Sequence, residues 1–181
     1  MMEHSALLII DIINDFQFKH GNALAEKTAT IYPNIVKLKD MMIKEQRPVI
    51  YINDHYNLWQ ADYDKIMEKC RNPLSAPIIE ALRPTDQDFF LIKPKHSAFY
   101  GTALHTLLSQ LKVKNLILTG IAGNICVLFT ANDAYMRELG LCIPHDAIAS
   151  ADEQDNEYAL KMMKNVLKAE VRSTEKLLSN S

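Results

Sequence analysis

Three side chains with reactive head groups stand at the ends of short apolar segments. Asp11 directly follows one apolar run, Lys93 follows another, and Cys126 opens a helical segment just after a third. If these runs are parallel strands of one sheet, their carboxyl ends share an edge and the three side chains meet there. Taken singly, each also fits an ordinary role: a turn carboxylate, a solvated lysine and a small core cysteine.

Together the three residue types suit acyl transfer through a thioester. A thiol at a helix N-terminus feels the positive end of the helix dipole, and a nearby ammonium acts in the same direction, so we expect a lowered pKa for Cys126. The Asp11 carboxylate would accept the thiol proton and return it to a leaving amine. Backbone N–H groups of the glycine-flanked turn 120–126 would form an oxyanion hole.

The elements that must position these groups alternate along the chain. Apolar runs predict strands at Ala6–Ile10, Val49–Ile52, Phe89–Ile92, Leu116–Leu118 and Leu141–Ile143, and a last strand near Glu170–Arg172 completes the series. Helical spacing of apolar residues predicts helices over 31–42, 104–111, 124–139 and 153–167. This alternation is typical of a parallel sheet with helices on both faces, that is, a three-layer Rossmann-like α/β/α sandwich. The stretch 53–77 has no strong period, and the whole chain, 1–181, is expected to form one domain.

Glycine is scarce, and its placement is uneven. Four of the five glycines lie between positions 101 and 140, which predicts special backbone geometry in that stretch. Gly120 and Gly123 flank the turn before Cys126, and Gly140 is expected to end the helix 124–139 from the position after its C-cap. Of the other two cysteines, we expect Cys70 to be exposed and Cys142 to be buried.

Composition excludes several classes of protein. With 181 residues, 48% of them hydrophobic, and a net charge of −2, the chain suits one soluble domain without a nucleic-acid or membrane partner. Three widely spaced cysteines make no CxxC pair and no zinc-ligand spacing, so a disulfide framework is not expected. The N-terminal residues lack a basic segment followed by a long apolar one, and we expect a cytoplasmic location.

Four blocks of sequence are recognisable as motifs of a known family. They are Leu7–Phe16 (LLIIDIINDF), Lys93–Leu104 (KPKHSAFYGTAL), Gly120–Val127 (GIAGNICV) followed by Thr130–Ala134 (TANDA), and Asp146–Ser150 (DAIAS). In order and spacing they are similar to the isochorismatase-like cysteine hydrolases, which include nicotinamidases and carbamoyl-amide hydrolases. The resemblance covers nearly the whole chain.

The resemblance implies a fold and a set of site residues. It implies a six-stranded parallel sheet between helical layers, and a catalytic triad of Asp11, Lys93 and Cys126. It further implies a cis peptide bond between Ile121 and Ala122, which would aim the N–H groups of Ala122 and Cys126 at an oxyanion. For substrate contacts we expect the aromatic residues near this rim, with Trp59 in a loop that could form a lid: Phe16, Trp59, His96 and Phe99.

One departure from the family bears on metal binding. Nicotinamidases carry a metal site that begins Asp-X-His, whereas here Asp54 and His55 are adjacent and no second histidine follows until His96. We therefore expect no metal and no cofactor, which counts against a nicotinamidase.

The function that this reading favours is hydrolysis of a small amide or carbamoyl compound by a Cys126 nucleophile, with Asp11 as base and acid and Lys93 in support. Two alternatives stay open: a vinyl-ether hydrolase of the isochorismatase type with Asp11 as general acid, and a non-enzymatic binding protein on the same fold. Methionine and aromatic residues on the predicted helices favour a homo-oligomer, a dimer or a tetramer.

Overall fold

One parallel sheet forms the middle of the molecule. The structure, a computed structural model, describes residues 4–179. The strands are β1 (Ser5–Ile10), β2 (Val49–Asp54), β3 (Phe89–Lys93), β4 (Asn115–Ile121), β5 (Gly140–Pro144), β6 (Ile148–Ala149) and β7 (Glu170–Arg172). Six of them follow the order β3-β2-β1-β4-β5-β7, and the short β6 pairs with the end of β4. The sheet therefore has the six predicted strands and a seventh of two residues.

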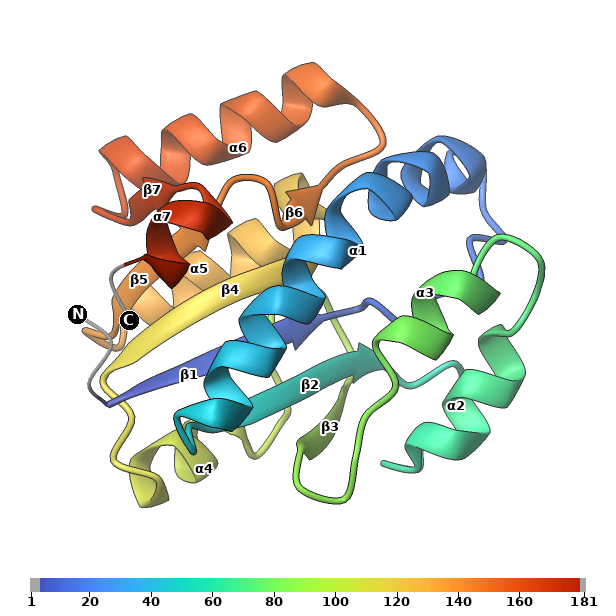
Figure 1. The fold of residues 1–181 in the computed structure, drawn as a ribbon, viewed down its shortest axis with the longest axis horizontal. Helices are drawn as coiled ribbons and strands as arrows, with labels where there is room; N and C mark the ends of the chain where they lie inside the picture. The colour runs from blue at the N-terminus through green and yellow to red at the C-terminus, as the bar shows by residue number, and fades with distance from the viewer. Residues whose placement is uncertain (1–3, 180–181) are drawn as a thin grey trace.

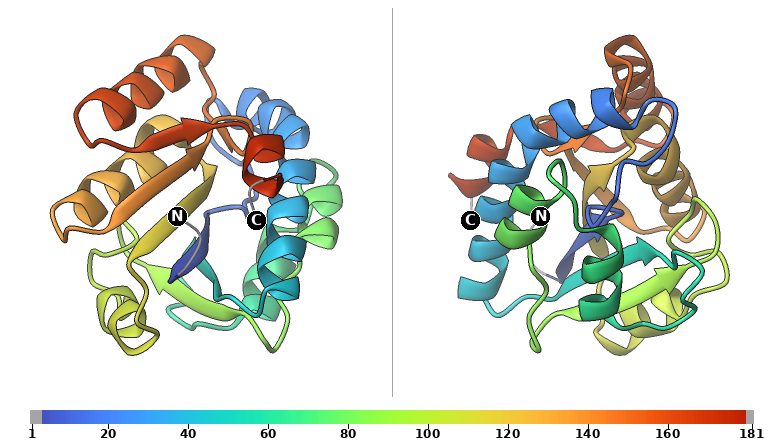
Figure 2. Two further views of the ribbon diagram at one scale, coloured as in Figure 1. Left: turned by 60° about the vertical axis from the view of Figure 1, so that its left-hand side comes forward. Right: turned by 90° about the vertical axis from the view of Figure 1, so that its right-hand side faces the viewer.

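Helices cover both faces of this sheet (Figures 1 and 2). One layer consists of α1 (Gly21–Lys44), α2 (Tyr63–Cys70), α3 (Ala76–Ala81) and α7 (Thr174–Leu178). The other consists of α4 (Leu104–Gln110), the π-helix η1 (Gly123–Val127), α5 (Leu128–Tyr135) and α6 (Glu153–Asn165). Each layer packs its apolar side chains on the sheet, so two cores lie on opposite faces of β1 and β4. The predicted three-layer α/β/α sandwich is confirmed.

The strand order reverses between β1 and β4, which places a crevice beyond their carboxyl ends. There Gly120 pairs with Ile10 across the two strands. Gly120 has φ +109°, and a Cβ at this position would lie 2.0 Å from the carbonyl oxygen of Ile10. Only glycine allows the two backbones to approach so closely, so this residue permits the β4 turn to lie against the end of β1.

The stretch 53–77 differs from the expectation, because it contains α2 and the start of α3. The side chain of Asp62 caps α2 by accepting a hydrogen bond from the N–H of Lys65. Our prediction of an exposed Cys70 is wrong: the residue is fully buried, with Sγ 3.8 Å from the carbonyl oxygen of Ile13. The charged neighbours of Cys70 lie on the outer side of α2, and this face was not evident from so short a segment. Cys142 is buried, as expected.

The predicted helix 124–139 is shorter and less regular than expected. It begins with the π-turn η1 and continues as α5 to Tyr135. Gly140 does not end it, because Glu138 takes the left-handed conformation there, with φ +59°. Gly140 instead starts β5, where a Cβ would lie 2.1 Å from Oδ1 of Asn115. Its lack of a side chain serves strand packing and not helix termination.

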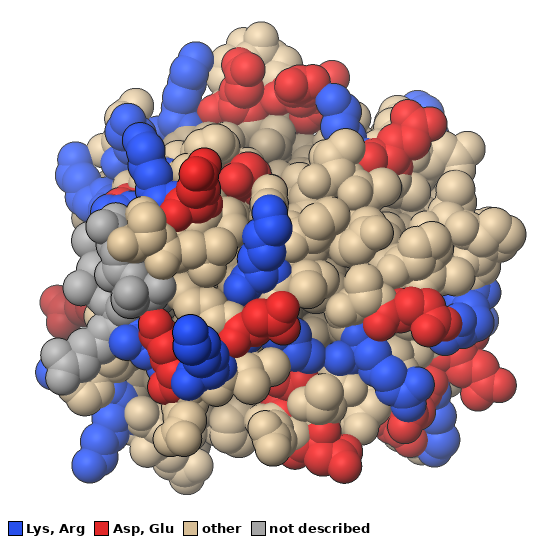
Figure 3. All heavy atoms as spheres, viewed as in Figure 1, with Lys and Arg blue, Asp and Glu red and all other residues tan. Residues whose placement is uncertain are grey.

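Within the described range 4–179, no helix is long and apolar enough to cross a membrane. On the face drawn in Figure 3, basic and acidic side chains are interspersed.

Candidate active site

The three predicted residues meet at the carboxyl ends of their strands. Asp11 directly follows β1, Lys93 is the last residue of β3, and Cys126 is the fourth residue of η1 after β4. The Lys93 ammonium lies 2.7 Å from Oδ2 of Asp11 and 3.5 Å from Sγ of Cys126. The side chains of Lys93 and Asp11 are only 3% and 9% exposed, so this ion pair is shielded from water.

The backbone around Asp11 fixes the direction of its carboxylate. Asp11 itself has φ +50°, and its Oδ1 accepts a hydrogen bond of 2.8 Å from the N–H of Asp54 at the end of β2. The buried amide of Asn53 donates to the carbonyl of Ile13 and accepts from the N–H of the same residue. This paired contact fastens the segment after Asp11 to the neighbouring strand.

The loop after β3 is tied to the helix that carries the thiol. The N–H of Ala98 donates to Oγ1 of Thr130, and that hydroxyl donates to the carbonyl of Cys126. One helical turn further, Ser97 hydrogen-bonds to Asp133. Lys93 also donates to the carbonyl of Lys95 at 3.0 Å. The second and third sequence motifs therefore hold each other in place, and with them Lys93 and Cys126.

The turn that delivers Cys126 is built around Ala122. The Ile121–Ala122 peptide bond is cis. The carbonyl of Ala122 accepts from the N–H groups of Ile125 and Val127, which closes the first turn of η1.

The sequence alone suggested no role for Asn156, yet the structure places this residue behind the turn. Ser150 is buried; its hydroxyl accepts from the N–H of Asn124 and donates to Oδ1 of Asn156. A Cβ on Gly123 would lie 2.2 Å from the same Oδ1 atom. The amide of Asn156 thus occupies the space that Gly123 leaves open, and it orients the hydroxyl that caps η1.

The charges in this cluster act against a preformed thiolate. Burial raises the pKa of the Cys126 thiol, the Asp11 carboxylate raises it further, and the Lys93 ammonium offsets only part of this increase. Burial likewise raises the pKa of Asp11, although Lys93 opposes it. For Lys93, burial acts to lower the pKa, but Asp11 and Cys126 outweigh it, so the ammonium is held charged. Our expectation of a lowered thiol pKa is wrong, because Lys93 does not compensate for burial beside an anion.

An open pocket of about 490 Å³ leads to the cluster. Its walls are Asp11, Asn14, Asp15, Phe18, Asp54, Tyr56, Lys93, Pro94, Lys95, His96 and Cys126. Of the predicted substrate contacts, His96 lines the pocket, with Nδ1 3.9 Å from Sγ of Cys126. Phe16 and Phe99 are buried and lie outside the pocket wall. Phe18, two residues after the first motif, also lines the pocket and was not predicted. Its ring is half exposed, and a prediction based on motifs carries no information about exposure.

The loop that follows β2 carries the remaining candidates. Trp59 is 64% exposed, and its ring stacks on His55 with centroids 3.9 Å apart. Nδ1 of His55 accepts from the N–H of Asn57, and Oδ2 of Asp54 accepts from the N–H of Tyr56. Both side chains thus take part in local turns. Among residues 4–179, no group of three or more His, Cys, Asp or Glu side chains is arranged to hold a metal ion.

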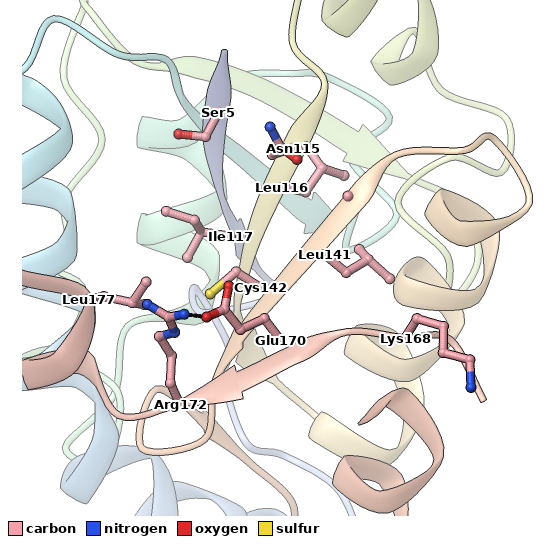
Figure 4. Close-up of a pocket in the computed structure, with 11 residues that line it drawn as sticks. Ser5, Asn115, Leu116, Ile117, Leu141, Cys142, Lys168, Glu170, Arg172 and Leu177 are labelled. Atoms are coloured by element: carbon pink, nitrogen blue, oxygen red, sulfur yellow. Dashed lines mark ion pairs between the residues drawn. The ribbon is translucent and has the colours of Figure 1, made fainter. Parts of the chain in front are cut away.

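A second pocket, of about 270 Å³, lies at the opposite edge of the sheet (Figure 4). Its walls come from the amino ends of β1, β4 and β5 and from the segment around β7. The charged residues Glu170 and Arg172 in this wall pair with each other, and the thiol of Cys142 is buried beside them. Lys168 also lines this pocket, and the carboxylate of Glu170 is paired with Arg172 and not with a lysine.

Comparison with known proteins shows the family of the chain. The family model described as the isochorismatase domain matches residues 5–176. The chain is 58% identical to the uncharacterized isochorismatase family protein YaaI of Bacillus subtilis (strain 168) over 173 residues, covering 96% of each chain. The solved nicotinamidase PncA from Bacillus subtilis superposes with a TM-score of 0.75 at 29% identity, covering 94% of this chain and 99% of that one. The N-carbamoylsarcosine amidase from Thermoplasma acidophilum superposes with a TM-score of 0.72 at 25% identity, covering 94% and 96%. The protein is therefore a member of the isochorismatase family, a family of hydrolases.

Proposed function

We propose that the protein hydrolyses a small amide or carbamoyl-type compound through a thioester on Cys126. The observation that carries this proposal is the buried cluster in which Lys93 contacts both Asp11 and Cys126 at the floor of an open pocket. Two solved relatives, named as a nicotinamidase and an N-carbamoylsarcosine amidase, act on bonds of this kind. A pocket of about 490 Å³ suits a small molecule.

Acylation begins with a neutral thiol, because the pKa of Cys126 is raised. The thiol donates a hydrogen bond to Asp11, and this carboxylate removes its proton as Sγ attacks the carbonyl carbon. Asp11 then gives the proton to the leaving nitrogen as the C–N bond breaks. Lys93 keeps Asp11 oriented throughout and stabilises the sulfur as it gains negative charge.

The oxyanion that forms during this attack needs donors beside the sulfur. We assign this role to the N–H groups of Ala122 and Cys126, because they belong to the turn that presents the thiol. The hydrogen bond from the N–H of Asn124 to the buried Ser150 holds that turn rigid, and rigid donors stabilise a developing charge without reorganisation.

The experiment that tests this proposal is incubation with a panel of small amides, followed by intact-protein mass spectrometry. We expect an acyl adduct that maps to Cys126 and is absent in Cys126→Ser. Cys70→Ala and Cys142→Ala are matched controls that keep the adduct, because both thiols are buried away from the pocket. The proposal is refuted if no adduct forms at position 126 in either the wild-type protein or Cys126→Ser and no amide in the panel is hydrolysed.

The raised pKa of Asp11 supports one second candidate function. A carboxyl group whose pKa is raised by burial, against the opposing charge of Lys93, is suited to donate a proton. In vinyl-ether hydrolysis Asp11 would be the general acid and Cys126 would be dispensable. Full activity of Cys126→Ala on a vinyl ether such as isochorismate would establish this function in place of amide hydrolysis.

We also propose that the protein assembles as a homodimer or homotetramer. Large apolar side chains are exposed on neighbouring helices: Phe129 on α5, and Tyr158 and Met162 on α6. Exposed apolar surface of this kind marks protein contacts. Sedimentation equilibrium measures the oligomeric state, and a monomer at micromolar concentration contradicts the proposal.

A further inference from the structure

The first turn of α6 is linked to the turn that presents the nucleophile, and Asn156 is the residue that makes the link. Ser150 is 2% exposed, and its hydroxyl accepts a hydrogen bond of 2.9 Å from the N–H of Asn124. The same hydroxyl donates to Oδ1 of Asn156 at 2.8 Å. Two consecutive hydrogen bonds therefore join α6 to the backbone of η1, two residues before Cys126.

The amide of Asn156 determines how the Ser150 hydroxyl is used. A serine hydroxyl has one proton to donate and two lone pairs that accept. Because Oδ1 of Asn156 takes the proton, a lone pair of the Ser150 oxygen faces the N–H of Asn124. A buried hydroxyl proton without a partner is costly. Without an acceptor at position 156 the hydroxyl would therefore turn towards another group, and its bond to Asn124 would weaken.

The absence of a side chain at position 123 makes room for this arrangement. A Cβ on Gly123 would lie 2.2 Å from Oδ1 of Asn156 and 3.1 Å from Oγ of Ser150. The amide and the hydroxyl thus lie directly against the first residue of η1. A second link between α6 and this turn, from Nδ2 of Asn124 to Oδ2 of Asp155, is 3.5 Å long and exposed. The buried path through Ser150 is therefore the firmer of the two.

We infer that Asn156 is a positioning residue for acyl transfer, which acts through Ser150 to hold the backbone donors beside Cys126 where the oxyanion forms. This inference rests on the proposed function, in which the N–H groups of Ala122 and Cys126 stabilise that oxyanion. Asn124 lies between these two donors in the chain, so its bond to Ser150 fixes the turn that carries both. Asn156 does not line the pocket that contains Cys126, and it acts only through the backbone of the turn.

The test compares two reactions of the same thiol. Acetylation by p-nitrophenyl acetate passes through a tetrahedral intermediate with a negatively charged oxygen, whereas alkylation by iodoacetamide is a substitution at a saturated carbon and forms no such oxyanion. A change in the pKa or the exposure of Cys126 acts on both reactions, so the ratio of acetylation rate to alkylation rate reports the oxyanion donors. We expect this ratio to fall about tenfold in Asn156→Leu, which is less than the roughly 10²–10³-fold loss when a donor itself is removed.

Three matched variants accompany Asn156→Leu. Asn156→Asp keeps an oxygen that accepts the Ser150 proton, so it should restore most of the lost ratio. Asp155→Ala removes the exposed link to Asn124 and should leave the ratio at the wild-type value. Ser150→Ala removes the hydroxyl itself and should lower the ratio as Asn156→Leu does, which gives the same measurement if leucine prevents folding.

The outcomes distinguish this inference from the proposed function. If wild-type Cys126 gains no acetyl group, the thioester mechanism fails, and this inference fails with it. If Cys126 is acetylated but the ratio is unchanged in Asn156→Leu and Ser150→Ala, the role of Asn156 alone is overturned. An equal fall in both rates also overturns that role, because Asn156 would then maintain the site as a whole. Failure of Asn156→Asp to restore the ratio does so as well.

Discussion

Replacing Lys93 by methionine should destabilise the fold strongly, because it leaves the buried carboxylate of Asp11 without its ion-pair partner. The two charges are 2.7 Å apart and almost fully shielded from solvent. At an effective dielectric constant of about 20, two unit charges at that distance attract by roughly 6 kcal/mol. Desolvation offsets part of this attraction, and removing one partner of a buried pair costs about 3–5 kcal/mol. In a chain of this size that loss corresponds to a decrease in Tm of roughly 6–20 °C.

The pH dependence of this loss gives a sharper test. Asp11 already has a raised pKa in the folded protein, and Lys93 is the charge that opposes the increase, so the pKa should rise further in Lys93→Met. A carboxyl group with a higher pKa in the folded than in the unfolded state binds a proton on folding. The stability deficit relative to wild type should therefore shrink as the pH falls from neutral towards the pKa of Asp11.

Urea unfolding of four proteins at several pH values measures these effects. Asp11→Asn combined with Lys93→Met removes both charges, and we expect this double variant to recover much of the free energy of unfolding that the single lysine variant loses. Lys27→Met is the control, because it breaks an exposed ion pair with Glu153 and should leave the midpoint unchanged. A deficit in Lys93→Met below about 1 kcal/mol, or one that is independent of pH, refutes this account of the pair.

Three further predictions concern the same edge of the sheet. Asp11→Asn removes an anion that raises the pKa of Cys126, so alkylation of this thiol by iodoacetamide at pH 7 should become faster while hydrolysis is lost; slower alkylation contradicts the assignment. Gly120→Ala should lower the free energy of unfolding by about 3 kcal/mol or more, because its Cβ would lie 2.0 Å from the Ile10 carbonyl oxygen; an unchanged urea midpoint is the contrary result. Trp59→Ala should change stability by less than about 0.5 kcal/mol, because Trp59 is largely exposed; it should raise KM for any substrate that the loop covers, and an unchanged KM removes the lid hypothesis.

The sequence indicated the positions of the strands and of the reactive groups because both depend on local pattern. Fully buried strands such as β1 appear as uninterrupted apolar runs, and the residue after each run lies at the edge where sites form. The distance from Lys93 to Ser97-Ala98-Phe99 lies within one such local stretch, and it is part of the resemblance to the family's second motif. These features require no knowledge of which distant segments touch.

Other features could not be predicted, because tertiary contacts decide them. The helix α2 is eight residues long, too short to be stable alone, and it forms because the core takes up its apolar face. The two-residue strand β6 exists only as a partner of β4. The sign of the pKa shift of Cys126 depends on how deeply the thiol is buried and how near Asp11 lies, and neither quantity can be obtained from spacing along the chain.

The way the thiol is enclosed makes it a reporter of chain assembly. Its contact with Lys93 joins positions 33 residues apart, and the bond that orients Asp11 spans 43. Such contacts form only after large loops have closed. During refolding, Cys126 should therefore acquire its native reactivity only when β1, β3 and β4 have all joined. Cys142 lies on β5, which pairs with β4 and with β7, and its protection would report the joining of this other part of the sheet. Brief pulses of an alkylating reagent would then resolve the order in which the two halves of the sheet close.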